Sequence, residues 1–361
     1  MTAAARSSVV ITGLGMRCAL GQNVIQSCAA VRAGISRFRE WPPADAPGGD
    51  EEMVIAGAAV VPDLGDRPWT EKLEELVTQP LLESLWMAGL DHIAEPYNST
   101  RLGLYLSVPQ LDRPGIDEGN AEEFLEEIRE NILFPFELGG AKVISTGHAG
   151  VLLVMEEAIR DLQASRIEAC VVGGVESLLE AGLLSSLMAE SKLKTDTVPA
   201  GLIPGEAAAF VVLETAEHVH ARGAETLACV TPVRTAFETT PASGDAPGRA
   251  DATVRVLQEA LADAPCSPSE IHQIINDLNG ERWRFLEWAI ADARVLTKLP
   301  PYRRLWHPAD CFGDIGAATG AAHLCMAARA FRRGYAVGRA ILVSNSSDSG
   351  ERAATVVFPN A

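Results

Sequence analysis

Residues 141–159, AKVISTGHAGVLLVMEEAI, join a short β-branched run, a turn and an apolar helical run. The turn carries Ser145, Thr146, Gly147 and His148. A strand that ends in a tight turn and restarts as a buried helix aims one side chain and several free backbone N–H groups at one point, which favours an activated nucleophile. However, the residue that ends the predicted strand is Ile144, which has no nucleophilic atom. Either a neighbour does the chemistry, or the chain keeps the frame of an enzyme without its reaction.

Ser145 is the first candidate for that neighbour. A serine nucleophile needs a nearby base, and His148 is the histidine in local reach. The competing interpretation is structural: Ser145 caps the helix that follows, and His148 is a partly buried, hydrogen-bonded side chain in the first turn. The local sequence leaves both interpretations open.

The elements that must position this turn follow an alternating pattern. Apolar strand-like runs alternate with longer helical runs, which predicts a layered α/β fold. The predicted strands are Val9–Thr12, Arg101–Val108, Ala141–Ser145, Ala169–Gly174, Ala208–Leu213, Ile271–Leu278, Ala340–Ser344 and Thr355–Phe358.

The two parts of the chain resemble each other. GEAAAFVVL, beginning at Gly205, has the pattern of GERAATVVF, beginning at Gly350, and each follows a strand-like run, EACVVGG or RAILVSN. Upstream of each strand lies a small-residue turn and a helix, STGHAGVLLVMEEAIRDL or GDIGAATGAAHLCMAARAF. Such self-similarity predicts a duplicated unit, with halves 1–225 and 226–361, and an active site between the copies at the strand ends.

Composition excludes several classes of function. The formal net charge of −18 disfavours nucleic acid and anionic membranes as partners, and no apolar run is long enough to span a bilayer. The seven cysteines are scattered without CxxC pairing, and the seven histidines form no ligand-spaced cluster, so we expect reduced thiols, no metal and no cofactor. The N-terminus has no long apolar segment of a signal peptide, which predicts a cytoplasmic protein.

Three further stretches resemble the β-ketoacyl synthases of the thiolase superfamily. They are VVITGLGMRCALGQNVIQSCAAVRAGISRF near the N-terminus, EACVVGGVESLL with its double glycine, and GLIPGEAAAFVVLETAEHVHARGAE at the end of the first half. The resemblance covers nearly the whole chain. It implies a five-layered α-β-α-β-α thiolase fold built from two similar halves, a strand and glycine turn at the N-terminus, and a dimer in which strand Ala141–Ile144 pairs with its twin.

The residues that carry the chemistry of that family do not match. The family uses a cysteine at the strand-to-helix elbow, which takes the acyl chain as a thioester, and two histidines that assist decarboxylation and hold the enolate oxygen. Alignment of ISTG with the Cys-Ser-Ser-Gly of the family puts Ile144 at the nucleophile position. IINDLNGERWRF offers Asn279 at the first histidine position, and FGDIGAATG offers Asp314 at the second.

The substitutes differ in what they could still do. Asn279 could donate a hydrogen bond to an oxyanion as a histidine does, although Asn279-Gly280 is also a plain turn signal. A carboxylate at Asp314 would repel the developing negative charge, and a helix-capping role for it is the simpler interpretation. Cys311, three residues before Asp314, has no cationic neighbour in its local sequence to activate it.

The resemblance therefore predicts a ketosynthase-like protein without condensing activity that serves as a pocket-bearing or scaffolding subunit. Two versions are open: a chain-length-factor-like subunit that pairs with an active ketosynthase and an acyl carrier protein, or an adaptor for secretion cargo such as that of type VI systems. We expect a homodimer, or a heterodimer with another ketosynthase-like chain. The alternative function is an active acyltransferase or thioester hydrolase that uses Ser145 with His148 and Asn279.

Overall fold

A computed structural model describes residues 8–41, 55–65, 67–90, 101–110, 113, 138–239 and 248–360. The strands are β1 (Val9–Cys18), β2 (Phe38–Trp41), β3 (Ile55–Ala59), β4 (Leu102–Ser107), β5 (Leu138–Ile144), β6 (Ala169–Ser177), β7 (Glu206–Thr215), β8 (Ala228–Val230), β9 (Arg234–Phe237), β10 (Gln273–Asn276), β11 (Arg304–Trp306), β12 (Ile341–Ser346) and β13 (Glu351–Phe358).

The helices alternate with these strands. They are α2 (Val24–Arg32), α3 (Trp69–Ala88), α5 (Gly150–Gln163), α6 (Ala181–Ala189), α7 (Ala216–Arg222), α8 (Asp251–Asp263), α9 (Arg282–Arg294), α10 (Ala309–Phe312) and α11 (Thr319–Arg332), with short 3-10 turns η4 (Gly147–Ala149), η5 (Pro268–Glu270), η6 (Leu296–Lys298) and η7 (Gly316–Ala318). None of the helices in the described segments is long and apolar enough to cross a membrane.

The same five-strand order occurs twice. One sheet region runs β5-β4-β6-β7-β1 and the other β11-β10-β12-β13-β8, and β8 joins them by pairing with both β1 and β13. The pairing senses also repeat, because β4 and β10 are each parallel to both neighbours whereas β7 and β13 are antiparallel to theirs. The similarity between the two parts of the sequence thus corresponds to one topology used twice. The boundary near residue 225 stays a prediction.

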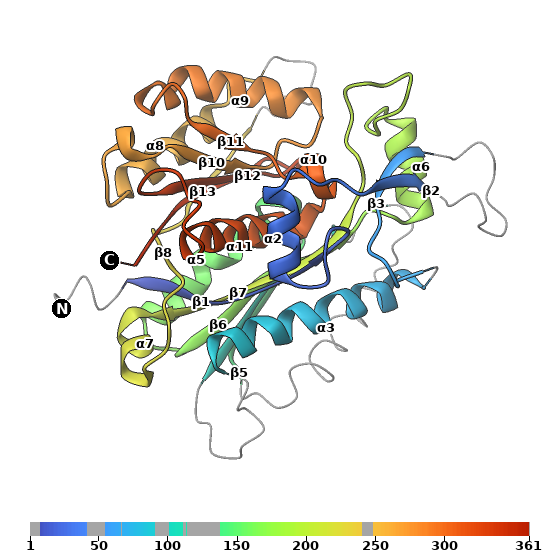
Figure 1. The fold of residues 1–361 in the computed structure, drawn as a ribbon. Helices are drawn as coiled ribbons and strands as arrows, with labels where there is room; N and C mark the ends of the chain where they lie inside the picture. The colour runs from blue at the N-terminus through green and yellow to red at the C-terminus, as the bar shows by residue number, and fades with distance from the viewer. Residues whose placement is uncertain are drawn as a thin grey trace.

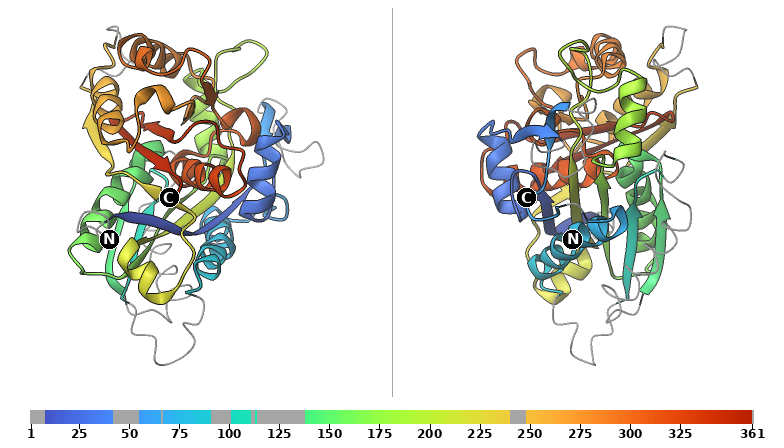
Figure 2. Two further views of the ribbon diagram at one scale, coloured as in Figure 1. Left: turned by 60° about the vertical axis from the view of Figure 1, so that its left-hand side comes forward. Right: turned by 90° about the vertical axis from the view of Figure 1, so that its right-hand side faces the viewer.

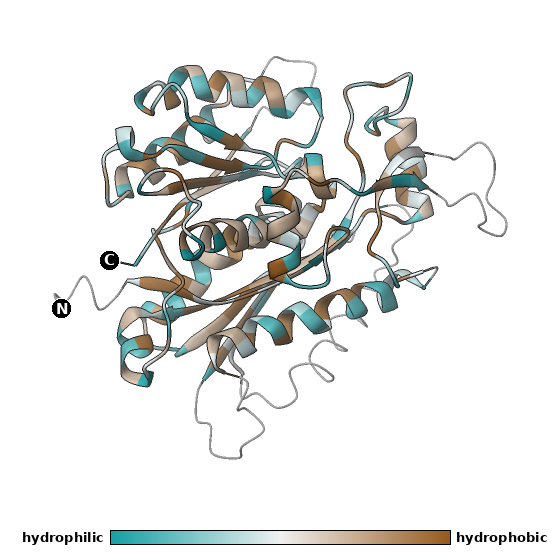
Figure 3. Cartoon of the chain, in the orientation of Figure 1, coloured by the Kyte–Doolittle hydropathy of each residue, from teal (hydrophilic) through white to brown (hydrophobic). Residues whose placement is uncertain are grey.

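Helices separate and cover the two sheet regions in five layers (Figures 1 and 2). Helix α3 covers the first region, α5 and α11 lie between the two, and α8 and α9 cover the second. The buried apolar side chains form three large clusters that fill the spaces between these layers. Figure 3 shows the corresponding difference in hydropathy: α3 and α9 alternate hydrophilic and hydrophobic residues, whereas α11 is largely apolar. Most residues of α11 are buried. This mixed α/β arrangement is the thiolase-like fold that the resemblance implied.

The expected glycine turn after the first strand is not a turn. β1 continues through Gly13 and Gly15 to Cys18, with an irregularity between Ile11 and Gly13. Helix α3 lies directly on this stretch, because a Cβ at Gly13 would be 2.0 Å from the Ser84 carbonyl oxygen and one at Gly15 would be 1.8 Å from the Pro80 carbonyl oxygen. The glycines are therefore needed for close packing of a helix on a strand, and the sequence pattern alone did not distinguish this from a turn.

Candidate functional site

The elbow identified in the sequence joins β5 to α5 at the centre of the molecule. β5 ends at Ile144, whose half-buried side chain packs against the cluster between the two sheet regions. Gly147 begins the 3-10 turn η4 with φ of +74°, and the Ala149 N–H donates to Ser347 Oγ at 3.0 Å. The second copy of this feature, the η7–α11 turn, contacts η4 directly. The two repeated elbows thus meet at one place.

Three of the predicted site residues come together there. His148 Nε2 lies 2.7 Å from Asp314 Oδ1, and Asn279 Nδ2 donates to Asp314 Oδ2 at 2.6 Å. Asp314 Oδ1 also accepts the Gly316 N–H at 2.8 Å, which caps the first turn of η7. Asp314 is 2% exposed, so these contacts take the place of water.

The electrostatic environment keeps Asp314 ionised. Burial alone would raise the pKa of its carboxyl, but His148, Arg284 and the Gly316 N–H outweigh burial and hold that pKa well below its usual range. The position that the family resemblance assigns to an oxyanion-binding histidine therefore carries a full negative charge.

The side-chain amide of Asn279 is also hydrogen-bonded within the protein. Its Nδ2 donates to Glu281 Oε2 at 3.0 Å as well as to Asp314, and its Oδ1 accepts the Glu281 N–H at 3.0 Å. Gly280 has φ of +108°, and a Cβ there would be 2.3 Å from the Gly201 carbonyl oxygen. Asn279 and Gly280 therefore form a tight turn. The side-chain NH2 group of Asn279 donates to two carboxylates, so it has no N–H left for the oxyanion of a ligand.

Arg284 is the residue that sequence reasoning missed. It is buried on α9 and donates to Asp277 at 3.0 Å and to Glu281 at 3.0 Å. Its Nη2 atom donates to Asp348 at 2.6 Å and lies 3.1 Å from His148 Nδ1. Its guanidinium also stacks on the Trp283 ring at 4.4 Å. The i, i+3 spacing from Glu281 was the one local signal, since Asp348 and His148 are far away in the sequence.

His148 is held at both ring nitrogens. Burial and the Arg284 charge favour the neutral ring, Asp314 and Asp277 favour the imidazolium, and the net effect raises the pKa of His148. The Arg284 N–H can donate to Nδ1 only while that nitrogen has no proton, so the neutral ring carries its proton on Nε2, facing Asp314. Neither nitrogen is available as a base for another residue in this arrangement.

Ser145 is not part of this network. It is half-buried in the link between β5 and η4, and within the described part of the chain no hydrogen bond joins it to His148. Since both ring nitrogens of His148 already have partners, His148 does not serve as the base that would activate the Ser145 hydroxyl.

The cysteines provide no replacement nucleophile. Burial, together with the nearby Asp310, raises the pKa of Cys311 to about 12, so this thiol stays protonated at neutral pH. All seven cysteines are free thiols, and six of them are buried. Among the described residues, no group of three or more His, Cys, Asp or Glu side chains is arranged to hold a metal ion.

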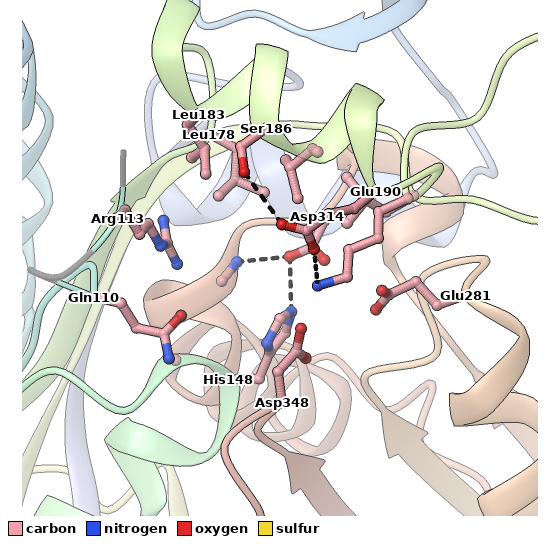
Figure 4. Close-up of a pocket in the computed structure, with 15 residues that line it drawn as sticks. Gln110, Arg113, His148, Leu178, Leu183, Ser186, Glu190, Glu281, Asp314 and Asp348 are labelled. Atoms are coloured by element: carbon pink, nitrogen blue, oxygen red, sulfur yellow. Dashed lines mark hydrogen bonds and ion pairs between the residues drawn. The ribbon is translucent and has the colours of Figure 1, made fainter. Parts of the chain in front are cut away.

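A cavity of about 200 Å³ opens beside the charged cluster (Figure 4). Part of its lining is apolar and is made by Leu178, Leu183, Leu187 and Leu202. Much of the rest is polar and is made by His148, Asp314, Glu281, Asp348, Lys192, Glu190, Gln110 and Arg113. Two of its cations are already paired, Lys192 with Glu190 at 2.8 Å and Arg113 with the buried Glu176 at 2.9 Å. The cavity is therefore small and amphipathic, and its charged groups mostly bind one another.

Comparisons with known proteins agree with a ketosynthase-like fold. No protein-family model matches the chain. A granaticin polyketide putative β-ketoacyl synthase 2 of Streptomyces violaceoruber is 34% identical over 107 residues, which are 29% of this chain and 24% of that protein. The matched segment thus spans about a quarter of that relative, and it supports homology with the β-ketoacyl synthases.

Three solved structures share the architecture over almost the whole chain. A type II polyketide ketosynthase in complex with its acyl-carrier protein has a TM-score of 0.80 at 17% identity and covers 98% of this chain and 99% of that one. The ishigamide ketosynthase/chain length factor has a TM-score of 0.78 at 19% identity, with 99% and 100% covered. The oxazolomycin ketosynthase domain KS7 of Streptomyces albus has a TM-score of 0.78 at 17% identity, with 98% and 74% covered. The chain therefore has the thiolase-like ketosynthase fold.

Proposed function

We propose that this chain is a ketosynthase-like subunit without condensing activity, which carries a small pocket and serves a partner as a scaffold. The observation that carries the proposal is the ionised, buried Asp314, which lies 2.7 Å from His148 and 2.6 Å from Asn279. Decarboxylative condensation passes through an enolate, and an enolate oxygen needs hydrogen-bond donors aimed at it. Here the donors of the site are aimed at a carboxylate that belongs to the protein.

The charge of Asp314 also opposes the binding of an enolate directly. A second anion placed beside a buried carboxylate would be repelled strongly, since the low dielectric of the interior weakens screening. The half-buried Ile144 adds to the argument, because the resemblance puts the acyl-accepting cysteine at that position. Both halves of the reaction, acyl transfer and enolate stabilisation, thus lack their residues.

The proposed partners follow from the structural neighbours and from an unpaired strand edge. One neighbour is a ketosynthase with its acyl-carrier protein and another is a ketosynthase/chain length factor, which favours the chain-length-factor-like version over the secretion adaptor. Within the described residues, β5 pairs only with β4, so the outer edge of β5 has free backbone groups. We propose that this edge pairs with a second ketosynthase-like chain, identical or different. The proposal places the protein in the cytoplasm, where its free cysteines stay reduced.

The test is a condensation assay with a malonyl thioester of an acyl carrier protein. We expect carbon dioxide release and acyl-chain extension at the uncatalysed background, with a condensing ketosynthase as the positive control in the same buffer. Turnover above background would overturn the proposal.

A further inference from the structure

The charged cluster beside the cavity contains more carboxylates than cations to pair with them. One guanidinium, that of Arg284, pairs at 2.6–3.0 Å with three carboxylates, those of Asp277, Glu281 and Asp348. A guanidinium has five N–H groups. Those of Arg284 point at the three carboxylates, at the Ser346 carbonyl oxygen and at His148 Nδ1. Arg284 therefore has no N–H left for a further carboxylate oxygen.

Two carboxylate oxygens that face the cavity are left without a donor. Glu281 is 4% exposed; its Oε2 atom binds Asn279 and Arg284, and its Oε1 atom accepts no hydrogen bond from any described residue. Asp348 uses Oδ1 for Arg284, and its Oδ2 atom likewise has no donor in the described segments. Both residues line the cavity and point their carboxylates toward it (Figure 4). A nearly buried carboxylate oxygen is costly without a donor, so these atoms form an acceptor site for a cation.

Lys192 shows which group this environment stabilises. Its ammonium lies in the same cavity and donates to Glu190 at 2.8 Å. Burial favours the neutral amine, but Glu190, Asp348 and Glu281 outweigh burial and raise the pKa of Lys192. The cavity thus already holds one ammonium group on an alkyl chain, and the surrounding carboxylates favour its charged form.

The rest of the cavity suits a short apolar chain. Leu183 and Leu187 of α6 line part of it together with Leu178 and Leu202. Its volume of about 200 Å³ is below the roughly 300 Å³ at which sites for drug-sized ligands begin. The side chain of Asp348 is 43% exposed, so a small molecule can reach the cavity from solvent on that side.

We propose that this cavity binds a small primary alkylammonium ion, whose ammonium donates to Glu281 and Asp348 and whose alkyl chain packs against the four leucines. A ligand that carries a carboxylate fits less well, because the ionised Asp314 repels it. A metal ion does not fit either, since no three His, Cys, Asp or Glu side chains of the described segments are arranged to hold one. This ligand class rests on the proposed function, because it names what the small pocket of that subunit takes.

The test compares three ligands of matched chain length, hexylammonium, hexanoate and 1-hexanol, by isothermal titration calorimetry at pH 7.5. We expect saturable binding of hexylammonium alone, roughly tenfold or more tighter than that of methylammonium, which lacks the apolar chain. Asp348→Asn should weaken hexylammonium binding about tenfold. Asp310→Asn is the matched control, because it removes the same charge from an exposed aspartate that does not line the cavity, and it should leave the affinity unchanged.

Lys192→Ala gives a second readout that misfolding cannot imitate. Removal of the lysine ammonium frees the Glu190 carboxylate and adds room in the cavity. Hexylammonium should therefore bind this variant about tenfold more tightly than the wild type. An unfolded variant would lose affinity, so the expected gain is specific to an intact cavity.

Three results would overturn the inference. The first is absence of saturable hexylammonium binding, or equal or tighter binding of hexanoate or 1-hexanol. The second is equal hexylammonium affinity in the Asp348→Asn and Asp310→Asn variants. The third is absence of a gain in Lys192→Ala. The condensation assay is read separately: failure of hexylammonium to bind while condensation stays at background overturns this inference alone, whereas condensation above background overturns the proposed function.

Discussion

Replacement of Asp314 by asparagine tests whether the charged cluster holds the fold together. The carboxylate accepts hydrogen bonds from His148, Asn279 and Gly316. Asparagine keeps one acceptor oxygen, so its NH2 group must face either the Asn279 donor or the His148 and Gly316 donors. If the NH2 group faces Asn279, that amide cannot turn round, because Glu281 holds both its oxygen and its nitrogen.

The magnitude follows from this geometry. One buried donor loses its partner, which costs about 1–3 kcal/mol, and two charge-assisted bonds become neutral ones of about half the strength. Asp314 is one of four carboxylates that act on the Arg284 guanidinium, so removal of its charge relieves some repulsion among them and offsets part of the loss. We expect D314N to lower the free energy of unfolding by about 2–4 kcal/mol at neutral pH. Because the pKa of Asp314 is depressed in the folded state, its stabilising contribution is present above the ordinary carboxyl pKa and decreases as the pH falls toward the folded-state value.

Urea unfolding followed by circular dichroism at pH 7.5 measures this difference. D310N is the matched control, since Asp310 is an exposed aspartate four residues earlier, and we expect its effect to stay within about 0.5 kcal/mol. If D314N is as stable as the wild type, or more stable, Asp314 is a strained carboxylate kept for function and our interpretation of the cluster is wrong.

Three other predictions concern stability, reactivity and assembly. Burial raises the pKa of Glu83 to about 7, so the free energy of unfolding should decrease as the pH rises from about 4.5 to 7. With allowance for partial solvent screening, Glu83 should account for about 1–3 kcal/mol of this decrease. Urea unfolding of E83Q over the same pH range should lack that contribution. Ile144→Cys should lower the free energy of unfolding by about 1–3 kcal/mol and should not restore condensation. The new thiol at the elbow should react with iodoacetamide faster than Cys266, the least buried native cysteine. An inert thiol there would mean that the elbow is misplaced. Sedimentation should show a stable dimer through the β5 edge, and a monomer at micromolar concentration would refute that seam.

The sequence predicted the fold well because the signals were local and repeated. Apolar runs indicated the strands, and the second occurrence of the turn-and-helix pattern indicated the duplication that the strand order shows. Ile144 was correctly placed at the end of its strand, since β-branched residues run up to a turn of small residues. The extent of β1 was not predicted, because the contact of Gly13 and Gly15 with α3 depends on a helix about 70 residues away.

The candidate site was predictable only in part. The family resemblance assigned Asn279 and Asp314 to one site, and the two side chains lie 2.6 Å apart, while their roles stay a prediction. Arg284 was missed, because its partners Asp277, Asp348 and His148 come from three separate segments and no local pattern connects them. The charge state of Asp314 likewise depends on those long-range contacts, and the sequence could not show that its neighbours favour the carboxylate.

The most direct test of the central claim is the intact mass of the protein after incubation with an acyl thioester. If the elbow has lost its nucleophile and Ser145 has no base, the mass should equal that of the untreated chain, and S145A should behave identically. An added acyl group on the wild type that is absent from S145A would contradict this account, because it would make the elbow an active acyl acceptor.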